Sequence, residues 1–311
     1  MTDFNQRTLK AAVTCQGVGL HSGERVQMTL RPAPAGSGIT FVRTDLEPAV
    51  EIPARSEHVV DTTFATTLGK DGARVGTVEH LLAALSGLGV DNARVELTGP
   101  EVPIMDGSAA PFVYLVRAAG IELQKRFKRF LVVRKALEVG EGGKRAQVTP
   151  APQFGVTCTV DFDHPLISDQ KLELTMSDRV FYREISRART FGFLRDVESL
   201  KRMGLALGGS LENAIVVDDF NILNPEGLRY SDEFVRHKIL DIVGDLALCG
   251  MPVIGHFTSV KSGHALNQKL LRRLLGEPGA AEVVEVSERK QLERMAILPP
   301  TWGALEKLPA A

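Results

Sequence analysis

The sequence predicts an α+β fold with two duplicated domains of similar topology, in which helices pack on sheets. Strand signals precede helix signals in both halves of the 311-residue chain. Glu79-His80 opens one helical stretch and Arg236-His237 lies early in another, and in each a glycine follows seven residues after the histidine. The shared order and pattern favour a duplication. Because clefts between domains commonly bind ligands, we expect the functional site at the domain interface.

The first domain is predicted over residues 1–124. Alternating and β-branched residues indicate its strands, and turn-forming Pro and Gly residues separate them. Gly87 and Gly89 end its first helix. Its predicted elements are strands over 26–30, 39–42 and 93–97 and helices over 81–88 and 112–119.

The second domain is predicted over 125–300, followed by a C-terminal tail over 301–311. The most basic stretch, 124–129, marks the boundary, and we interpret it as a solvated linker rather than a nucleic-acid site. A βαβ insert is expected at about 190–220. The other predicted elements are strands over 130–133, 146–148, 156–162, 214–217 and 253–257 and helices over 178–185, 232–249 and 265–275.

Composition and charge exclude several classes of protein. The formal net charge of -1 gives no global field that would attract nucleic acid. Cys15, Cys158 and Cys249 are widely spaced and form no CxxC pair, which argues against a disulfide framework or a zinc ribbon. The first residues, which lack a basic stretch followed by an apolar run, argue against a secretory signal, and no apolar stretch is long enough to span a bilayer. We therefore expect a cytoplasmic protein without a transmembrane segment.

A polar stripe on the predicted 232–249 helix is the strongest candidate site. His237, Asp241 and Asp245 follow i, i+4, i+8 spacing and so share one face. A solvated polar face is the ordinary explanation of such charges. Here, however, apolar residues flank the stripe on both sides, and buried carboxylates need a cation or a hydrogen-bond partner.

The His-x-x-x-Asp spacing suits two metal ligands, because the side chains lie one helical turn apart. A catalytic zinc ion commonly takes three protein ligands, and His80 from the matching helix is the candidate third. Glu79 is a candidate base, provided that it lies in the first turn, where the backbone is less regular. The alternatives are a hydrogen-bonded structural histidine and a glutamate that complements the helix dipole.

Other candidates lie in loops. His264 follows a predicted strand and precedes a helix, where Asp245 would hold it protonated as an acid for a leaving amine. Lys238 and Lys261 are candidates for phosphate binding, although lone lysines are more often surface charge. The apolar stretch 190–217 is either an amphipathic helix with its turn or a groove for an acyl chain, and the residues favour neither.

Beyond these candidates, the chain resembles the bacterial UDP-3-O-acyl-N-acetylglucosamine deacetylases of lipid A biosynthesis. The resemblance runs from Gln6 to about residue 300. The matching stretches are Gly17–Gly23 (GVGLHSG), Thr77–Leu81 (TVEHL), Pro103–Phe112 (PIMDGSAAPF), Ser186–Phe193 (SRARTFGF), Asp232–Lys238 (DEFVRHK) and Lys261–Asn267 (KSGHALN).

The resemblance implies two α+β domains of shared topology, each with an insert, packed around a metal site. It also implies a metal-dependent amidohydrolase that holds one catalytic zinc ion, with ferrous iron as the alternative. His80, His237 and Asp241 would bind the ion, Glu79 would be the base, and His264 would be the acid paired with Asp245. Thr190 and Lys238 would stabilise the oxyanion and contact the substrate. The implied acyl passage comprises Phe191, Leu194, Val197, Ala206, Ser210, Ala214 and Val216, and Leu20, His21 and Gly209 are further expected substrate contacts. Lys144, Asp161, Phe162, Lys238 and Lys261 would lie at the uridine diphosphate end.

The implied substrate is an acylated UDP-sugar, and we expect a monomer that binds no nucleic acid. Some relatives carry a cysteine near the metal where this chain has the stretch 63–66 (TFAT), which implies the loss of a site for an inhibitory second metal. Two rivals remain open: a zinc hydrolase of another amide or ester, and a non-enzymatic carrier of an acylated nucleotide sugar. The carrier would leave the buried His/Asp stripe unexplained.

Overall fold

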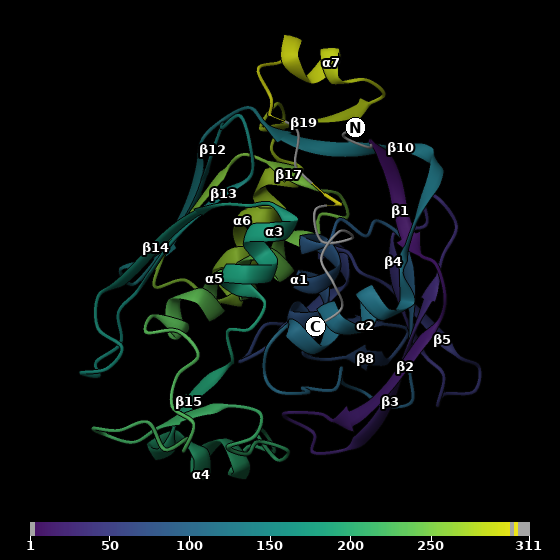
Figure 1. Ribbon diagram of the computed structural model, residues 1–311. Helices are drawn as coiled ribbons and strands as arrows, with labels where there is room; N and C mark the ends of the chain where they lie inside the picture. The colour runs from purple at the N-terminus through teal and green to yellow at the C-terminus, as the bar shows by residue number, and fades with distance from the viewer. Residues whose placement is uncertain (1–3, 299–301, 304–311) are drawn as a thin grey trace.

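Two five-stranded sheets form opposite faces of the molecule, and helices fill the space between them (Figure 1). The computed structural model describes residues 4–298 and 302–303. Most of the predicted C-terminal tail, residues 301–311, therefore lies outside the described residues. The α+β class expected from the sequence is confirmed.

The first sheet has the strand order β2-β3-β9-β4-β5. Its pairs are antiparallel except for β4 and β9, which run parallel. Alternate residues point into the core, as in β9, where Ala93, Val95 and Leu97 are buried. The strands are β2 (Val13–Val18), β3 (Arg25–Pro32), β4 (Ile39–Arg43), β5 (Val50–Pro53) and β9 (Ala93–Leu97).

The second sheet repeats this arrangement with the order β11-β12-β18-β13-β14. Again only one pair, β13 with β18, is parallel. The two sheets thus share one topology, which the sequence predicted; the duplication itself stays a prediction. The strands are β11 (Leu137–Glu141), β12 (Lys144–Thr149), β13 (Gly155–Val160), β14 (Gln170–Thr175) and β18 (His256–Val260).

Four helices lie between the sheets, and their apolar faces form one continuous core with the inner faces of the strands. The two central helices, α1 and α5, pack on each other. Within the described residues, no helix is long and apolar enough to cross a membrane. The four helices are α1 (Glu79–Gly87), α2 (Ala110–Ala119), α5 (Glu233–Ala247) and α6 (His264–Gly276).

Each half carries an insert in the chain between the edge strand β5 or β14 and the central helix α1 or α5. The first insert is η1 (Ser56–His58) and the small sheet of β6 (Val59–Asp61), β7 (Thr67–Lys70) and β8 (Ala73–Val75). The second follows α3 (Asp178–Val180) and the π-helix η2 (Phe181–Ile185), and comprises β15 (Phe191–Phe193), α4 (Leu194–Arg202) and β16 (Ile215–Val217). Because β15 and β16 pair in parallel, the second insert is the predicted βαβ unit.

The basic stretch 124–129 is not the expected solvated linker. It lies inside β10 (Ile121–Val133), so the domain boundary placed at 124/125 falls within one long strand. β1 (Asn5–Leu9) pairs with its first part, and β17 (Val253–Ile254) and β19 (Ala281–Val286) flank its end; α7 (Arg289–Arg294) follows. Lys128 is fully buried beside Asp91, so pairing and this ion pair place part of the charge run inside the protein.

The strand expected over 253–257 is divided between two sheets. β17 ends at Ile254 and joins β10, whereas β18 begins at His256 and joins the second five-stranded sheet. Gly255 makes the transition, and a Cβ there would lie 2.6 Å from Val133 Cγ2. The chain crosses at a point too crowded for a side chain.

Candidate metal centre

The polar stripe of α5 is buried against α1. His237, Asp241 and Asp245 are 2%, 4% and 1% exposed, so the ordinary solvated face is excluded. Glu233, one turn earlier on the same face, is also fully buried. Apolar neighbours on both sides of the stripe belong to the core, which forces these polar groups to find partners inside the protein.

His80, His237 and Asp241 meet at one point. Each offers a ligand atom, and these atoms all lie within 4.8 Å of one another. His80 Nε2 and His237 Nε2 lie 3.6 and 3.4 Å from Asp241 Oδ1. Two ligands at about 2.1 Å from a tetrahedral ion are roughly 3.4 Å apart. Two imidazoles and a carboxylate at this spacing fit one zinc or ferrous ion.

The protonation states suit metal binding. Burial lowers the pKa of His237 to about 3, so its imidazole is neutral. Burial opposes ionisation of Asp241, but the positive charge of Lys238 outweighs it and holds the pKa of that carboxyl well below its usual value. Lys238 Nζ lies 2.9 Å from Asp241 Oδ2. Neutral imidazole and ionised carboxylate are the forms that bind a cation.

A strained turn starts α1 and brings Glu79 beside His80. Thr77 has a φ of +54°, which is unfavourable for a β-branched residue. Its hydroxyl donates to Glu101 Oε1 at 2.7 Å, and Glu101 also accepts from the backbone of His21 and Ser22. The helix then begins at Glu79 itself. Glu79 thus lies in the first turn of α1. This is the position from which Glu79 and its sequence neighbour His80 can both reach one centre.

Glu79 and His264 face each other beside the three ligands. His264 Nε2 lies 3.8 Å from Glu79 Oε1, and its Nδ1–H donates to Asp245 Oδ2 at 2.9 Å. Thr66 links the two carboxylates, because its N–H donates to Glu79 at 3.1 Å and its hydroxyl to Asp245 at 2.7 Å. The Asn267 amide also donates to Asp245, at 2.8 Å. The predicted base, acid and orienting carboxylate are therefore brought together.

Burial and charge set the protonation of this pair. Burial raises the pKa of Glu79, and the neighbouring His264 only partly offsets that effect. Burial alone would lower the pKa of His264, but Asp245 and Glu79 raise it to about 10. The carboxylate is thus a stronger base than an exposed one, and the imidazole carries a proton at neutral pH.

The expected substrate residues surround the centre to different degrees. The Phe162 ring is 5.6 Å from that of Phe191, and Lys238 Nζ lies 5.6 Å from the Phe191 ring. Lys261 forms a 2.6 Å ion pair with Asp161. Lys144 begins β12, which pairs with β18 immediately before Lys261. Thr190 follows the Ala188–Arg189 segment beside His237, and its N–H donates to Gly107.

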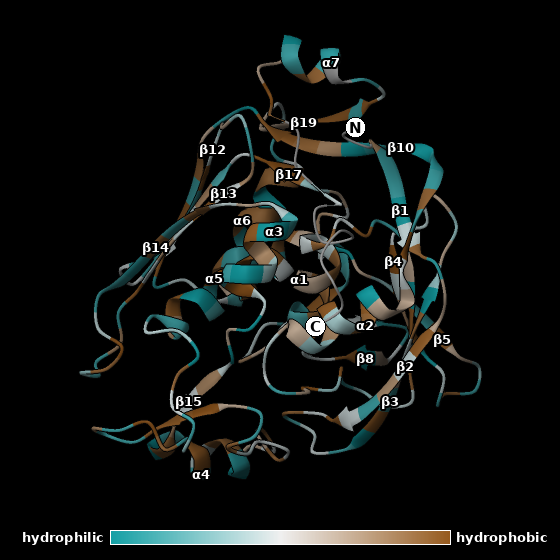
Figure 2. Ribbon diagram, viewed as in Figure 1, coloured by the Kyte–Doolittle hydropathy of each residue, from teal (hydrophilic) through white to brown (hydrophobic). Residues whose placement is uncertain are grey.

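The insert and the loop of Leu20 and His21 contact each other across the two halves. The N–H of Ala206 donates to His21 Nδ1 at 3.4 Å, and Gly208 N–H donates to the Leu20 carbonyl at 3.0 Å. α4 buries none of its residues and carries both hydrophobic and hydrophilic colour in Figure 2. Val197, Ala206, Ala214 and Val216 are half-buried, and Leu194, Gly209 and Ser210 are exposed. The expected acyl-passage residues thus lie on this open insert.

Sequence reasoning gave no role to Thr66, Arg189, Glu233 or Asn267. Glu233 had a usable signal, because it continues the α5 stripe four residues before His237. Thr66 had none, since it contacts carboxylates 13 and 179 residues away. Arg189 lies in a matched stretch, but only the fold reveals its contacts with Glu226 and Glu233.

Comparison with known proteins agrees with this geometry. The family model of the UDP-3-O-acyl N-acetylglycosamine deacetylases matches residues 6–276. A Myxococcus xanthus protein named UDP-3-O-acyl-N-acetylglucosamine deacetylase is 62% identical over 95% of this chain and 94% of its own. Proteins of the same name from Anaeromyxobacter dehalogenans and Hahella chejuensis are 58% and 56% identical over 92% and 90% of this chain, and 92% and 94% of theirs. With a match over most of its length, the chain belongs to the UDP-3-O-acyl N-acetylglycosamine deacetylase family.

Proposed function

We propose that this protein hydrolyses the N-acetyl group of UDP-3-O-(3-hydroxyacyl)-N-acetylglucosamine, giving the free amine and acetate, a committed step of lipid A biosynthesis. One observation carries the proposal: the buried His80, His237 and Asp241 lie beside a carboxylate, Glu79, and a protonated imidazole, His264. These are the groups that metal-assisted amide hydrolysis needs.

Each residue takes a role from its position. His80, His237 and Asp241 would hold one divalent ion, which when bound would polarise the acetamide carbonyl as a Lewis acid and make a water molecule more acidic. Glu79 removes the proton from the attacking water, because its raised pKa makes it a stronger base than an exposed glutamate. Thr190, which follows two residues after the carbonyl that contacts His237, donates its hydroxyl to the developing oxyanion, and Lys238 adds positive charge.

Departure of the sugar amine needs a proton. His264 donates it from Nε2, while Asp245, bound to Nδ1, stabilises the charged imidazole. Phe162, Lys144, Asp161 and Lys261 hold the uridine diphosphate end, and the insert residues hold the acyl chain. Without protonation the amine would be a poor leaving group, and the buried His264–Asp245 pair supplies the proton that it needs.

We further propose that the ion is zinc, with ferrous iron as the alternative, because both accept two imidazoles and a carboxylate. The cytoplasmic location and the monomeric state are predictions from the sequence. So is the role of the open insert as an acyl passage, for which the exposed Leu194, Met203 and Leu207 give support.

The test is acetate release from UDP-3-O-(3-hydroxyacyl)-N-acetylglucosamine by the purified protein, measured before chelation, after chelation and after zinc is added back. We expect activity to vanish and then to return with up to one equivalent of zinc. Substrate binding without acetate release under any metal condition would contradict the proposal and favour a carrier. Release from a different amide or ester in a substrate panel, but not from this one, would favour another hydrolase.

A further inference from the structure

A backbone carbonyl fixes the orientation of one metal ligand. His237 Nδ1–H donates to the Ala188 carbonyl at 3.1 Å. The proton is thus held on Nδ1, and Nε2 is the lone-pair nitrogen that faces Asp241. In metal sites the partner of the second ring nitrogen sets the tautomer and the ring orientation. The position of Ala188 therefore matters to the metal centre.

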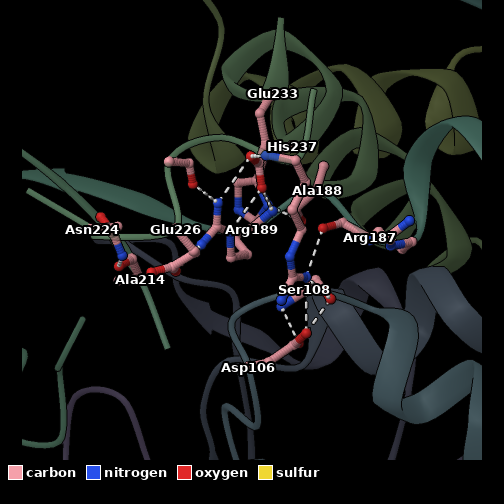
Figure 3. A network of polar contacts seen from close by, with 12 residues as sticks. Asp106, Ser108, Arg187, Ala188, Arg189, Ala214, Asn224, Glu226, Glu233 and His237 are labelled. Carbon is pink, nitrogen blue, oxygen red and sulfur yellow. Dashed lines mark hydrogen bonds and ion pairs between the residues drawn. The ribbon is translucent and has the colours of Figure 1, made fainter. Parts of the chain in front are cut away.

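The residue after Ala188 is tied to the same helix that carries His237. Arg189 donates to Glu233 Oε1 through both its backbone N–H and its Nε, at 3.0 and 2.9 Å, and through Nη2 to Oε2 at 3.2 Å (Figure 3). Glu233 lies one helical turn before His237. The side chains of Arg189 and Glu233 are 2% and 0% exposed. The Ala188 carbonyl and the His237 imidazole are thus both positioned by the same stretch of α5.

The remaining polar atoms of this ion pair also have partners. Arg189 donates to Glu226 Oε1 at 2.5 Å and to the Gly227 carbonyl at 2.7 Å, and Arg229 N–H donates to Glu233 Oε2 at 2.6 Å. A buried ion pair is costly unless its hydrogen bonds are satisfied. When all its hydrogen bonds are formed, an arginine–carboxylate pair joined by two hydrogen bonds allows little movement of either side chain. Its geometry is therefore well defined.

The other side of the segment is held by the first half of the molecule. Thr190 N–H donates to the Gly107 carbonyl at 2.8 Å. Arg229 forms a 2.9 Å ion pair with Asp106 and donates to the Arg187 carbonyl at 2.9 Å. Figure 3 shows Asp106, Ser108 and Arg187 gathered on this side of Arg189. Residues 187–190 are thus fixed from α5 and from the 106–108 loop.

We propose that Arg189 and Glu233 form a positioning pair for the metal centre. They hold the Ala188 carbonyl so that it keeps the proton of His237 on Nδ1, and they hold the adjoining Thr190 in place. Neither side chain contacts substrate or the reacting atoms. The inference rests on the proposed function for the nature of the ion and for the role of Thr190.

The test uses Glu233→Gln, which keeps the shape of the side chain but removes its charge. Asp91→Asn is the matched control, because it makes the same change in the buried Asp91–Lys128 ion pair, which lies near Gly89 beyond the other end of α1. Zinc affinity is measured by competition with a chromophoric chelator. The tautomer of His237 is read from the ring nitrogen-15 shifts of selectively labelled apo-protein.

We expect Glu233→Gln to weaken zinc binding by about 10–100-fold and to mix the two tautomers of His237. Asp91→Asn should leave the zinc affinity and the single tautomer of His237 unchanged, even if it lowers the melting temperature. In the acetate assay with saturating zinc, Glu233→Gln should lower kcat more than it raises KM. Arg189→Lys keeps the charge but loses the forked geometry, so it should act in the same direction if Glu233→Gln does not fold.

The proposal is overturned if both variants fold and keep wild-type zinc affinity and a single His237 tautomer, with only a lowered melting temperature. The pair would then be a structural one like Asp91–Lys128. Failure of the proposed function is a separate result, because an inactive wild-type protein would still permit the zinc and tautomer measurements.

Discussion

Glu79 and His264 differ in charge although both are buried in one cluster. Burial disfavours charge on either group, but only the imidazole is hydrogen-bonded to an opposite charge, because Asp245 accepts its Nδ1–H. The pKa of Glu79 is raised by burial, whereas that of His264 is raised to about 10 despite burial. The environments of the two neighbouring groups thus suit the base and the acid that we propose.

Replacement of the base separates metal binding from catalysis. Glu79→Gln should retain the ion, because His80, His237 and Asp241 are unchanged, and should lower kcat by about 10²–10⁴-fold. Metal content measured by atomic absorption and acetate release on the same preparation check this. A variant that cannot rebind zinc after chelation would instead make Glu79 a ligand.

The acid gives a prediction about pH. As a proton donor, His264 loses activity when the pH rises through its pKa, so this pKa sets the basic limb of the kcat profile. In Asp245→Asn the main charge that raises this pKa is gone and the opposing effect of burial remains. The basic limb should therefore move to lower pH. A basic limb that stays in place, measured from pH 6 to about 10.5, would show that another group is the acid.

At this scale the sequence predicted local relationships well. The spacing of His237, Asp241 and Asp245 is set by the helical repeat alone, and the structure places all three on one buried face. Thr66 and Arg189 were missed because their contacts join segments far apart in the chain. Periodicity carries no information about such pairs.

At the scale of elements, the approach of α1 to α5 places the base. A Cβ on Gly244 would lie 2.1 Å from the Glu79 carbonyl oxygen and 2.9 Å from its Cα. The absence of a side chain at Gly244 therefore permits α5 to touch the backbone of the first turn of α1. The sequence marked this glycine only as part of an internal repeat, not as a contact.

Gly244→Ala should force the two helices apart. Overpacking of this kind costs about 1–3 kcal/mol of unfolding free energy, and the shift of Glu79 should lower kcat as well. Gly276→Ala is the control, because nothing lies within 4 Å of the added methyl group there. Urea unfolding and acetate release are measured on both variants. Equal stability and activity in the two would mean that the helices do not need this close contact.

The elements that the sequence misread have a common physical cause. In β10 the basic stretch 124–129 suggested a linker, but neighbouring strands supply the backbone hydrogen bonds, and Asp91 supplies the counter-charge for Lys128. The strands of the first insert were likewise not predicted, being only three or four residues long. Tertiary pairing, rather than local pattern, forms such elements.

At the scale of the whole molecule, the proposed metal site draws its ligands from both halves. α1 supplies His80, and α5 supplies His237 and Asp241. Without an ion, three ligands packed within 4.8 Å of one another have no central charge to hold them together. Bound metal should therefore stabilise the packing of one half on the other, and not only the catalytic centre.

Removal of the metal should lower the melting temperature of the entire protein in one transition. An ion present at 1,000 times its dissociation constant adds about 4 kcal/mol, which corresponds to roughly 6 °C for a protein of this size. Because the ligands come from both halves, His80→Ala should abolish the shift while the apo-protein still melts as one unit. Calorimetry of wild type and variant, each with and without zinc, checks this. Two separate transitions in the apo-protein, of which zinc moves only one, would show that the two halves unfold independently and that the ion stabilises only one of them.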